Sequence, residues 1–94
     1  MEISFSNSFK KAFAKKVKRD KNLENKFWST VKIFLENPFD NSLRTHKLSG
    51  KLKELWSFSV EYDIRIIFFF EENQTKAIFI DFVSVTKHQM KLIK

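Results

Sequence analysis

The sequence predicts one α+β domain, in which a helix hairpin packs on one face of an antiparallel sheet. Apolar residues recur at helical spacing before Pro38, and they alternate with polar residues after Leu55. The length of 94 residues suits a single hydrophobic core and would crowd two. The expected order of elements is therefore strand, helix, helix and then three strands.

The N-terminal half is expected to hold a short strand and two helices. Residues 2–6 alternate polar and apolar types, and residues 6–8 (Ser-Asn-Ser) are all types that cap a helix N-terminus. The first helix should bury Phe9, Ala12, Phe13 and Val17. The second should run from Leu23 to about Asn37, because the residue before Pro38 disfavours helical torsions. Its buried stripe should comprise Leu23, Phe27, Val31 and either Phe34 or Leu35, widened by Trp28.

The C-terminal half is expected to supply the sheet. Residues 39–50 read as a polar loop, and residues 56–62 alternate in the manner of a strand with one wet face. Ile64–Phe70 is apolar on both sides apart from Arg65, which is typical of a central strand covered on both faces. A turn at 71–76 should lead to a strand at Ala77–Val85, and residues 86–94 should add a short helical turn. Short turns between three strands predict an antiparallel meander.

Composition excludes several classes of protein. Hydrophobic residues make up 43% of the chain, so it has the apolar surface that a disordered chain lacks. There is no Cys, which excludes a disulfide or cysteine–metal scaffold and fits a reducing compartment. The N-terminus has no apolar stretch of the signal-peptide type, and the longest apolar run has five residues against about 20 for a membrane span. We therefore expect a cytoplasmic protein without a membrane segment.

Charge indicates an anionic partner. The formal net charge is +7, and residues 1–20 alone carry six cations against two acids. Such a surplus favours attraction to nucleic acid or to an acidic protein, although a lysine-rich face can equally be no more than solvated. The first helix carries most of this surplus, with its cations gathered toward the C-terminal end, where the helix dipole favours them.

The residues that could perform chemistry lie in the C-terminal half. The two histidines, without Cys or a paired-His helix, are a weak metal set, and one Gly excludes a phosphate-cradling glycine loop. Arg65 interrupts an apolar strand, so we expect it either to pair with a nearby carboxylate or to bind phosphate. His46 and His88 are candidates for a general acid or base near neutral pH. Trp56 is either a core residue or a stacking platform for a base, and the lysines near Gly50 either hold an RNA backbone or are solvated.

Residues 46–70, HKLSGKLKELWSFSVEYDIRIIFFF, resemble the central block of the RelE/ParE toxin superfamily. The shared features are the H-x-L-x-G run at His46, the strand containing Trp56 and the strand that opens with Arg65. The helix hairpin that ends in Asn-Pro-Phe and the hydrophobic C-terminal strand also resemble the family. The resemblance covers nearly the whole chain and implies a helix hairpin on a curved antiparallel sheet.

The resemblance also implies a function, the toxin of a type II toxin–antitoxin system. RelE-like members cleave mRNA on the ribosome without a metal or other cofactor, by attack of a ribose 2′-OH on the adjacent phosphate. Arg65 matches the strand Arg that contacts the scissile phosphate, His46 matches the loop His of YafQ-like members, and Asp63 stands near the acid that those members keep. His88 stands just past the last strand, where many members have a His. The implied RNA contacts are Lys47, Lys51, Lys53, Trp56 and Lys87.

Two other functions stay open at this point. ParE-like members inhibit DNA gyrase and cut nothing. Leu92 stands where the family has a C-terminal aromatic, which keeps open a toxin-like binding module without catalysis. The implied partners are an acidic antitoxin that wraps the basic helix hairpin and covers the sheet, together with the ribosome and mRNA for the nuclease.

Overall fold

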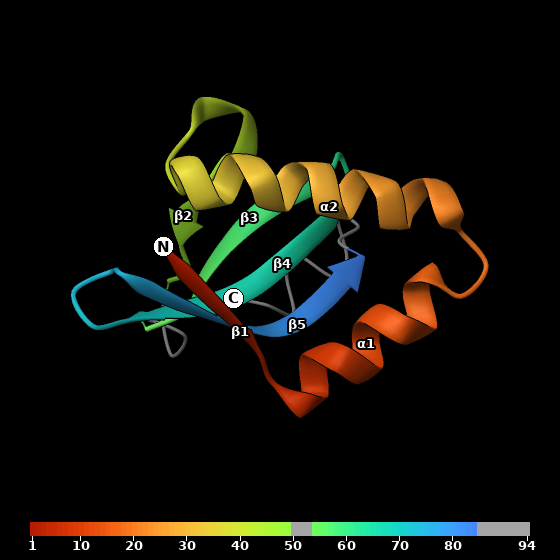
Figure 1. Ribbon diagram of the computed structural model, residues 1–94, viewed down its shortest axis with the longest axis horizontal. Coiled ribbons are helices and arrows are strands. Elements are labelled where there is room, and N and C mark those ends of the chain that lie inside the picture. The colour runs from red at the N-terminus through yellow and green to blue at the C-terminus, as the bar shows by residue number, and fades with distance from the viewer. Residues whose placement is uncertain (50–53, 85–94) are drawn as a thin grey trace.

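Two helices cover one face of a five-stranded sheet in the computed structural model, which describes residues 1–49 and 54–84 (Figure 1). This arrangement confirms the predicted α+β fold class. The predicted helical turn at 86–94 and the end of the last strand at Val85 lie outside the described residues. The elements in chain order are β1 (Glu2–Phe5), α1 (Asn7–Val17), α2 (Lys21–Glu36), the 3-10 helix η1 (Asn41–Leu43), β2 (His46–Lys47), β3 (Trp56–Glu61), β4 (Ile64–Glu71) and β5 (Lys76–Ser84).

The sheet has the strand order β1-β5-β4-β3-β2. The last three strands form the predicted antiparallel meander. β1 returns beside β5 in parallel, so the sheet is mixed rather than wholly antiparallel. β4 is its central strand and is buried on both faces, as predicted, since Ile66 and Ile67 point to opposite sides and are 0% and 7% exposed.

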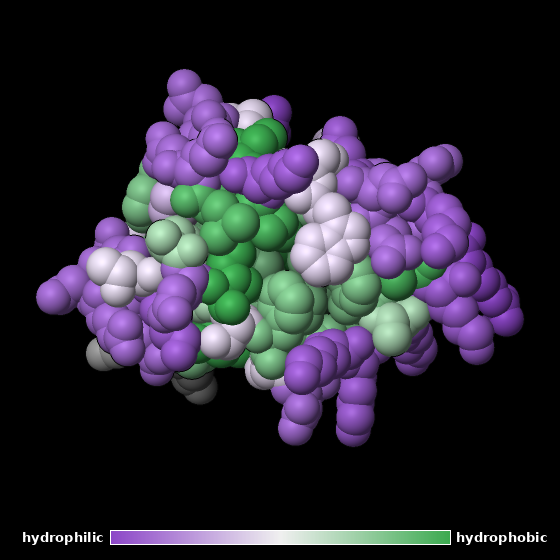
Figure 2. All heavy atoms as spheres, viewed as in Figure 1, coloured by the Kyte–Doolittle hydropathy of each residue, from purple (hydrophilic) through white to green (hydrophobic). Residues whose placement is uncertain are grey.

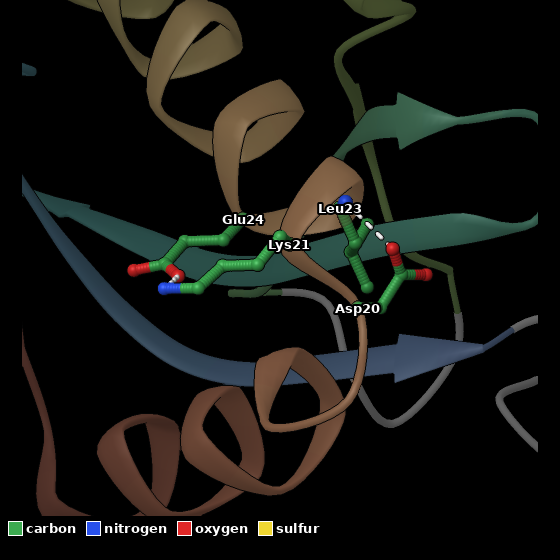
Figure 3. A network of polar contacts seen from close by, with 4 residues as sticks. All are labelled: Asp20, Lys21, Leu23 and Glu24. Atoms are coloured by element: carbon green, nitrogen blue, oxygen red, sulfur yellow. Dashed lines mark hydrogen bonds and ion pairs between the residues drawn. The ribbon is translucent and has the colours of Figure 1, made fainter.

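Side chains at the helix N-termini explain where the helices begin. The Ser6 hydroxyl accepts a hydrogen bond from the backbone N–H of Phe9 (3.0 Å), and the Asp20 carboxylate accepts one from Leu23 (3.0 Å). Each bond satisfies an amide that has no partner within its own helix. In α2 an ion pair between Lys21 and Glu24 (3.5 Å) lies beside this cap (Figure 3). The second helix ends before Pro38, as predicted.

A phenylalanine-rich core joins the two layers. α1 packs mainly on β5, and α2 packs on β3. The predicted stripe of α2 is buried, and Phe34, stacked on Phe58 with ring centroids 4.7 Å apart, is its fourth member. Leu35 is 41% exposed and Trp28 is 46% exposed, so neither widens the buried stripe. Trp28 instead contacts Phe5 and Phe27 with one side of its indole ring.

Three local expectations are wrong. The predicted loop at 39–50 contains η1 and the edge strand β2, because Asp40 caps the first and His46 and Lys47 pair with β3. Tyr62 belongs to the β3–β4 turn and is 90% exposed, so it is not an inward strand residue. Ser57, assigned to the wet side of its strand, is 1% exposed.

The register of the sheet defines which residues share a face. Phe58, Ile66 and Phe82 lie opposite one another on the helix-covered face. The neighbouring cross-strand rows therefore point to the other face, which we call the distal face. One row holds His46, Ser57, Ile67 and Asp81, and the other holds Ser59, Arg65 and Val83.

Hydrophilic side chains surround the edge of the view in Figure 2, and apolar surface gathers at its centre between α2 and β1. Among the described residues, no helix combines the length and the apolar character that crossing a membrane requires.

Candidate functional site

His46 and Arg65 come together on the distal face through one shared neighbour. His46 lies opposite Ser57 in the β2–β3 pair, and Arg65 reaches Ser57 from β4, where its Nη1 donates to the serine Oγ at 3.4 Å. The two residues are two strands apart and offset by two residues along the strand direction, which corresponds to about 12 Å between their backbones. The long guanidinium side chain shortens that gap, so the structure brings these two sequence-predicted site residues together.

Arg65 has no carboxylate partner among residues 1–49 and 54–84. The ion pairs that the sequence offered as an explanation, with Glu61, Asp63 or Asp81, do not form there, since Lys21–Glu24 is the only ion pair within those ranges. Ser57, a neutral hydroxyl, is the single hydrogen-bond partner found for the guanidinium in this part of the chain. A half-buried cation with one long neutral hydrogen bond keeps most of its five N–H donors for an anion.

Electrostatics supports the same conclusion for Arg65. Burial lowers the pKa of its guanidinium below the ordinary value for arginine, and the nearby cation of Arg44 lowers that pKa further. Both effects disfavour a charge that arginine nonetheless keeps near neutral pH. A bound anion would offset both effects, because it restores favourable contacts to the guanidinium and neutralises the repulsion.

Arg44 is the site residue that sequence reasoning missed. It ends η1 in the left-handed conformation (φ 52°), and its backbone N–H donates to the carbonyl of Asn41 at 3.3 Å. This bend leads directly into β2 and leaves the Arg44 cation close enough to affect Arg65. The run Arg-Thr-His-Lys was visible in the sequence, but only the unforeseen strand β2 shows which of its members lie near Arg65.

His46 is exposed, and its ring is oriented by a backbone contact. Its Nδ1 lies 2.9 Å from the carbonyl oxygen of Arg44. Because a carbonyl can only accept, this hydrogen bond requires the proton on Nδ1 and leaves Nε2 of the neutral ring free to accept a proton. His46 therefore has the arrangement that a general base needs.

Lys47 and Trp56 lie on the helix-covered side of the sheet, away from Arg65. They are opposite one another in the β2–β3 register, and the lysine Nζ lies 6.0 Å from the centroid of the indole ring. Trp56 packs against Phe39 and Phe70, with ring centroids 5.5 Å and 5.3 Å away. The structure thus favours the core interpretation of Trp56 and does not bring either residue to the distal face.

Asp63 lies in the exposed β3–β4 turn, two residues before Arg65. That spacing corresponds to about 7 Å along a strand. His88, Lys51, Lys53 and Lys87 lie outside the described residues. Among the residues that are described, no group of three His, Asp or Glu side chains is placed to hold a metal ion.

A cavity adjoins the two rows of the distal face. Its volume is about 410 Å³, and it has a mainly apolar lining with Asp81 and Ser8 as polar members. Ile67 and Val83, which line it, are the direct cross-strand neighbours of Ser57 and Arg65. The distal face therefore combines a cationic site, an oriented imidazole and an apolar hollow.

No protein-family model matches the sequence, and no curated protein matches it. The fold is similar to a YoeB/ParE toxin from Agrobacterium tumefaciens, at a TM-score of 0.75 and 14% identity over 92% of this chain and 100% of that one. It is also similar to YafQ from E. coli strain BL21(DE3), at a TM-score of 0.69 and 22% identity over 99% and 98% of the two chains.

A further similar structure is a heterotetrameric YoeB–YefM toxin–antitoxin complex from Staphylococcus aureus, with a TM-score of 0.69 and 17% identity over 86% of this chain and 92% of that chain. The fold is therefore similar to that of YoeB and YafQ toxins, in agreement with the fold that the sequence resemblance implied.

Proposed function

We propose that this protein is the toxin of a type II toxin–antitoxin system and that it cleaves mRNA on the ribosome. The observation that carries the proposal is the guanidinium of Arg65, which is half-buried on the distal face without a carboxylate partner among the described residues and lies one side chain away from His46. The fold of YoeB/ParE and YafQ toxins supports it. The scissile phosphate is the anion that would occupy this site.

The proposed reaction uses the RNA's own nucleophile. Nε2 of His46 takes the proton of a ribose 2′-OH, and the 2′-oxygen forms a bond to the adjacent phosphorus. The bond from phosphorus to the 5′-oxygen breaks, and that oxygen leaves with a proton from a second group, for which His88 is the sequence candidate. Arg65 and Arg44 stabilise the charge that develops on the phosphate oxygens. The products are a 2′,3′-cyclic phosphate and a 5′-hydroxyl end.

Net charge supports a polyanionic substrate. The chain carries +7, and each phosphate contact made by a cation releases condensed counterions. Lys47, Lys51, Lys53, Lys87 and Trp56 stay sequence-based candidates for contacts to RNA outside the reacting phosphate. Because Lys47 and Trp56 face the helix side, any contact that they make would be with a more distant part of the RNA or the ribosome.

An acidic antitoxin is the proposed protein partner, in the cytoplasm. α1 contains four lysines and no acidic residue, and α2 leaves Trp28 and Leu35 half exposed. Exposed apolar side chains beside a cationic helix fit an acidic chain with apolar anchors. With the antitoxin bound, we expect backbone amides of α1 and α2 to exchange hydrogen more slowly. Slower exchange only in other elements would contradict this binding mode.

Primer extension on a translated mRNA tests the nuclease. Purified protein added to a translating extract is expected to produce cuts in phase with the reading frame, and Arg65→Ala is expected to lower the cleavage rate at least about 100-fold. The matched control is Arg19→Ala, which removes an exposed arginine in the connection between α1 and α2. The control should cut like the wild type.

Three outcomes would contradict the proposal. Cleavage that survives Arg65→Ala would remove the assigned phosphate site. Intact mRNA, together with altered supercoiling of a plasmid by gyrase, would instead support a ParE-like inhibitor. Intact mRNA without a gyrase effect would leave a binding module.

A further inference from the structure

The cavity beside Arg65 has the size and composition of a ligand site. Its volume of about 410 Å³ falls within the range of about 300–1,000 Å³ that small-molecule sites occupy. Its apolar walls come from β4, from β5 and from residues that adjoin β2 and β3, and they suit a flat, weakly polar group. The described residues that form these walls are Leu48, Leu55, Ile67, Ile80 and Val83.

The sheet register fixes this cavity next to the proposed phosphate site. Val83 is directly opposite Arg65, and Ile67 is directly opposite Ser57, the hydroxyl that Arg65 contacts. Neighbouring strands lie about 4.8 Å apart, so Ser57, which the guanidinium contacts, lies one strand spacing from Ile67 and two spacings, about 10 Å, from Asp81. That separation matches the span between a phosphate and its own base in a nucleotide.

Asp81 is the only charged group among the described residues that line the cavity. It lies where the β4–β5 pairing shifts register, between Ile67 and Phe68, and its Oδ1 accepts a hydrogen bond from the backbone N–H of Phe82 at 2.8 Å. No cation among residues 1–49 and 54–84 forms an ion pair with it. A carboxylate offers about four lone-pair positions, so most of its accepting capacity remains available to a ligand.

We propose that this cavity binds a guanine base of the RNA whose phosphate lies on Arg65, with the Asp81 carboxylate accepting hydrogen bonds from guanine N1–H and N2–H. This inference rests on the proposed function and deepens it by naming the base. The Watson–Crick edge of a single-stranded base is free for such contacts. Guanine is the one base that presents two adjacent donors there, and a carboxylate is an acceptor on both oxygens. Adenine, cytosine and uracil each place an acceptor atom against the carboxylate, and the two acceptors repel each other.

An acid in an RNA site lowers affinity for the phosphate chain as a whole. This loss of affinity is offset only by a base that donates hydrogen bonds to the carboxylate. Asp81 therefore contributes selectivity rather than overall affinity. Arg65 does the reverse, because it contacts phosphate and cannot distinguish bases. Substitutions at the two positions are therefore expected to have separable effects.

The test is an NMR titration of the isolated protein with nucleoside monophosphates, which needs neither the ribosome nor cleavage. The probes are the 3′- and 5′-monophosphates of guanosine, adenosine, cytidine, uridine and inosine, at constant ionic strength. Guanosine monophosphate should shift the backbone amides of Ile67, Asp81 and Val83 saturably and bind about tenfold more tightly than the adenosine, cytidine and uridine forms. The affinity for inosine monophosphate, which lacks the N2 amino group, should lie between the affinity for the guanosine form and the affinities for the other three.

Four variants sharpen the test. Asp81→Asn should lose the preference for guanine and gain one for adenine, because an amide both donates and accepts. Its matched control is Glu72→Gln in the exposed β4–β5 turn, which should keep the wild-type order. If Asp81→Asn does not fold, Val83→Phe, which fills the cavity without changing charge, should abolish the preference. Arg65→Ala should weaken all nucleotides equally.

Equal affinities for all five nucleotides, or a guanine preference that persists in Asp81→Asn, would overturn the proposal. An absence of saturable shifts at Ile67, Asp81 and Val83 would also overturn it. If Val83→Phe left nucleotide binding intact but prevented an antitoxin from binding, the cavity would be a protein-docking site. Because none of these results depends on cleavage, they are separate from a failure of the nuclease assay.

Discussion

At the scale of single residues, Arg65 is held in an environment that disfavours its charge. Its pKa is lowered first by burial and then by Arg44, and no carboxylate among the described residues compensates either effect. A half-buried cation on a central strand lowers the stability of the folded chain when no carboxylate pairs with it. This combination of cost and unused donors is typical of functional rather than structural arginines.

Arg65→Met is therefore expected to raise the free energy of unfolding while it abolishes mRNA cleavage. The expected gain is about 0.5–1 kcal/mol, at the lower end of single stabilising substitutions because the guanidinium is only half-buried. Urea unfolding followed by circular dichroism measures it. A loss of stability of the same size would mean that the contact of Arg65 with Ser57 outweighs the cost of desolvation.

At the scale of elements, η1 and β2 position the site, although both are very short. Asp40 caps η1 by accepting from both the hydroxyl (2.7 Å) and the backbone N–H (2.9 Å) of Ser42. Arg44 then bends the chain, and His46 enters β2 two residues later. The orientation of His46 thus depends on a cap four to six residues upstream.

The cap should make stability depend on pH. The Ser42 hydroxyl, followed by its backbone N–H, lowers the pKa of the Asp40 carboxyl below its ordinary value of 3.8. A lowered folded-state pKa means that the stabilisation is complete above the unfolded value and is lost as pH falls through the folded value. The stability advantage of the wild type over Asp40→Asn should therefore shrink below about pH 4. Urea midpoints measured across acidic pH test this, and a difference that stays constant throughout would refute it.

Sequence patterns predicted the elements whose identity depends on burial alone. The stripes of α1 and α2 and the two-sided strand β4 follow from the spacing of residues such as Phe27 and Ile66. The short strand β2 escaped prediction, because two residues carry no period and pair only through the tertiary contact with β3. Tyr62 continued the alternation of its strand by chance, since a turn residue can be aromatic without being buried.

The site was predictable only in part. Arg65 was visible in the sequence as a lone cation in an apolar strand. His46 was visible as a member of a family motif. That Lys47 faces away from His46 follows from strand alternation, which required knowing that residues 46 and 47 form a strand. Asp81 and the cavity beside it depend on a register shift between β4 and β5 that no local pattern encodes.

At the scale of the whole molecule, one aromatic core holds the two layers in place. Phe27 of α2 is 0% exposed and contacts Phe9 and Phe13 of α1 and Phe82 of β5. It therefore links both helices to the strand that carries Asp81.

Phe27→Ala is expected to lower the free energy of unfolding by about 3–5 kcal/mol, because it leaves a cavity among rings that cannot collapse into it. The matched control is Trp28→Ala at the next position. Trp28 is 46% exposed, so its removal should cost less than half as much. Equal losses in the two variants, measured by urea unfolding, would show that the core is not organised around Phe27.

In the proposed mechanism, the distal face directs the RNA's own 2′-OH onto a phosphate held by Arg65. Mass spectrometry of the mRNA fragment upstream of a ribosome-dependent cut tests this mechanism. We expect a 2′,3′-cyclic phosphate at the 3′ end of that fragment, and no cut when the nucleotide before the cleaved bond carries a 2′-deoxy substitution. A fragment that ends in a free 3′-hydroxyl, or cleavage that persists in the deoxy-substituted mRNA, would contradict it.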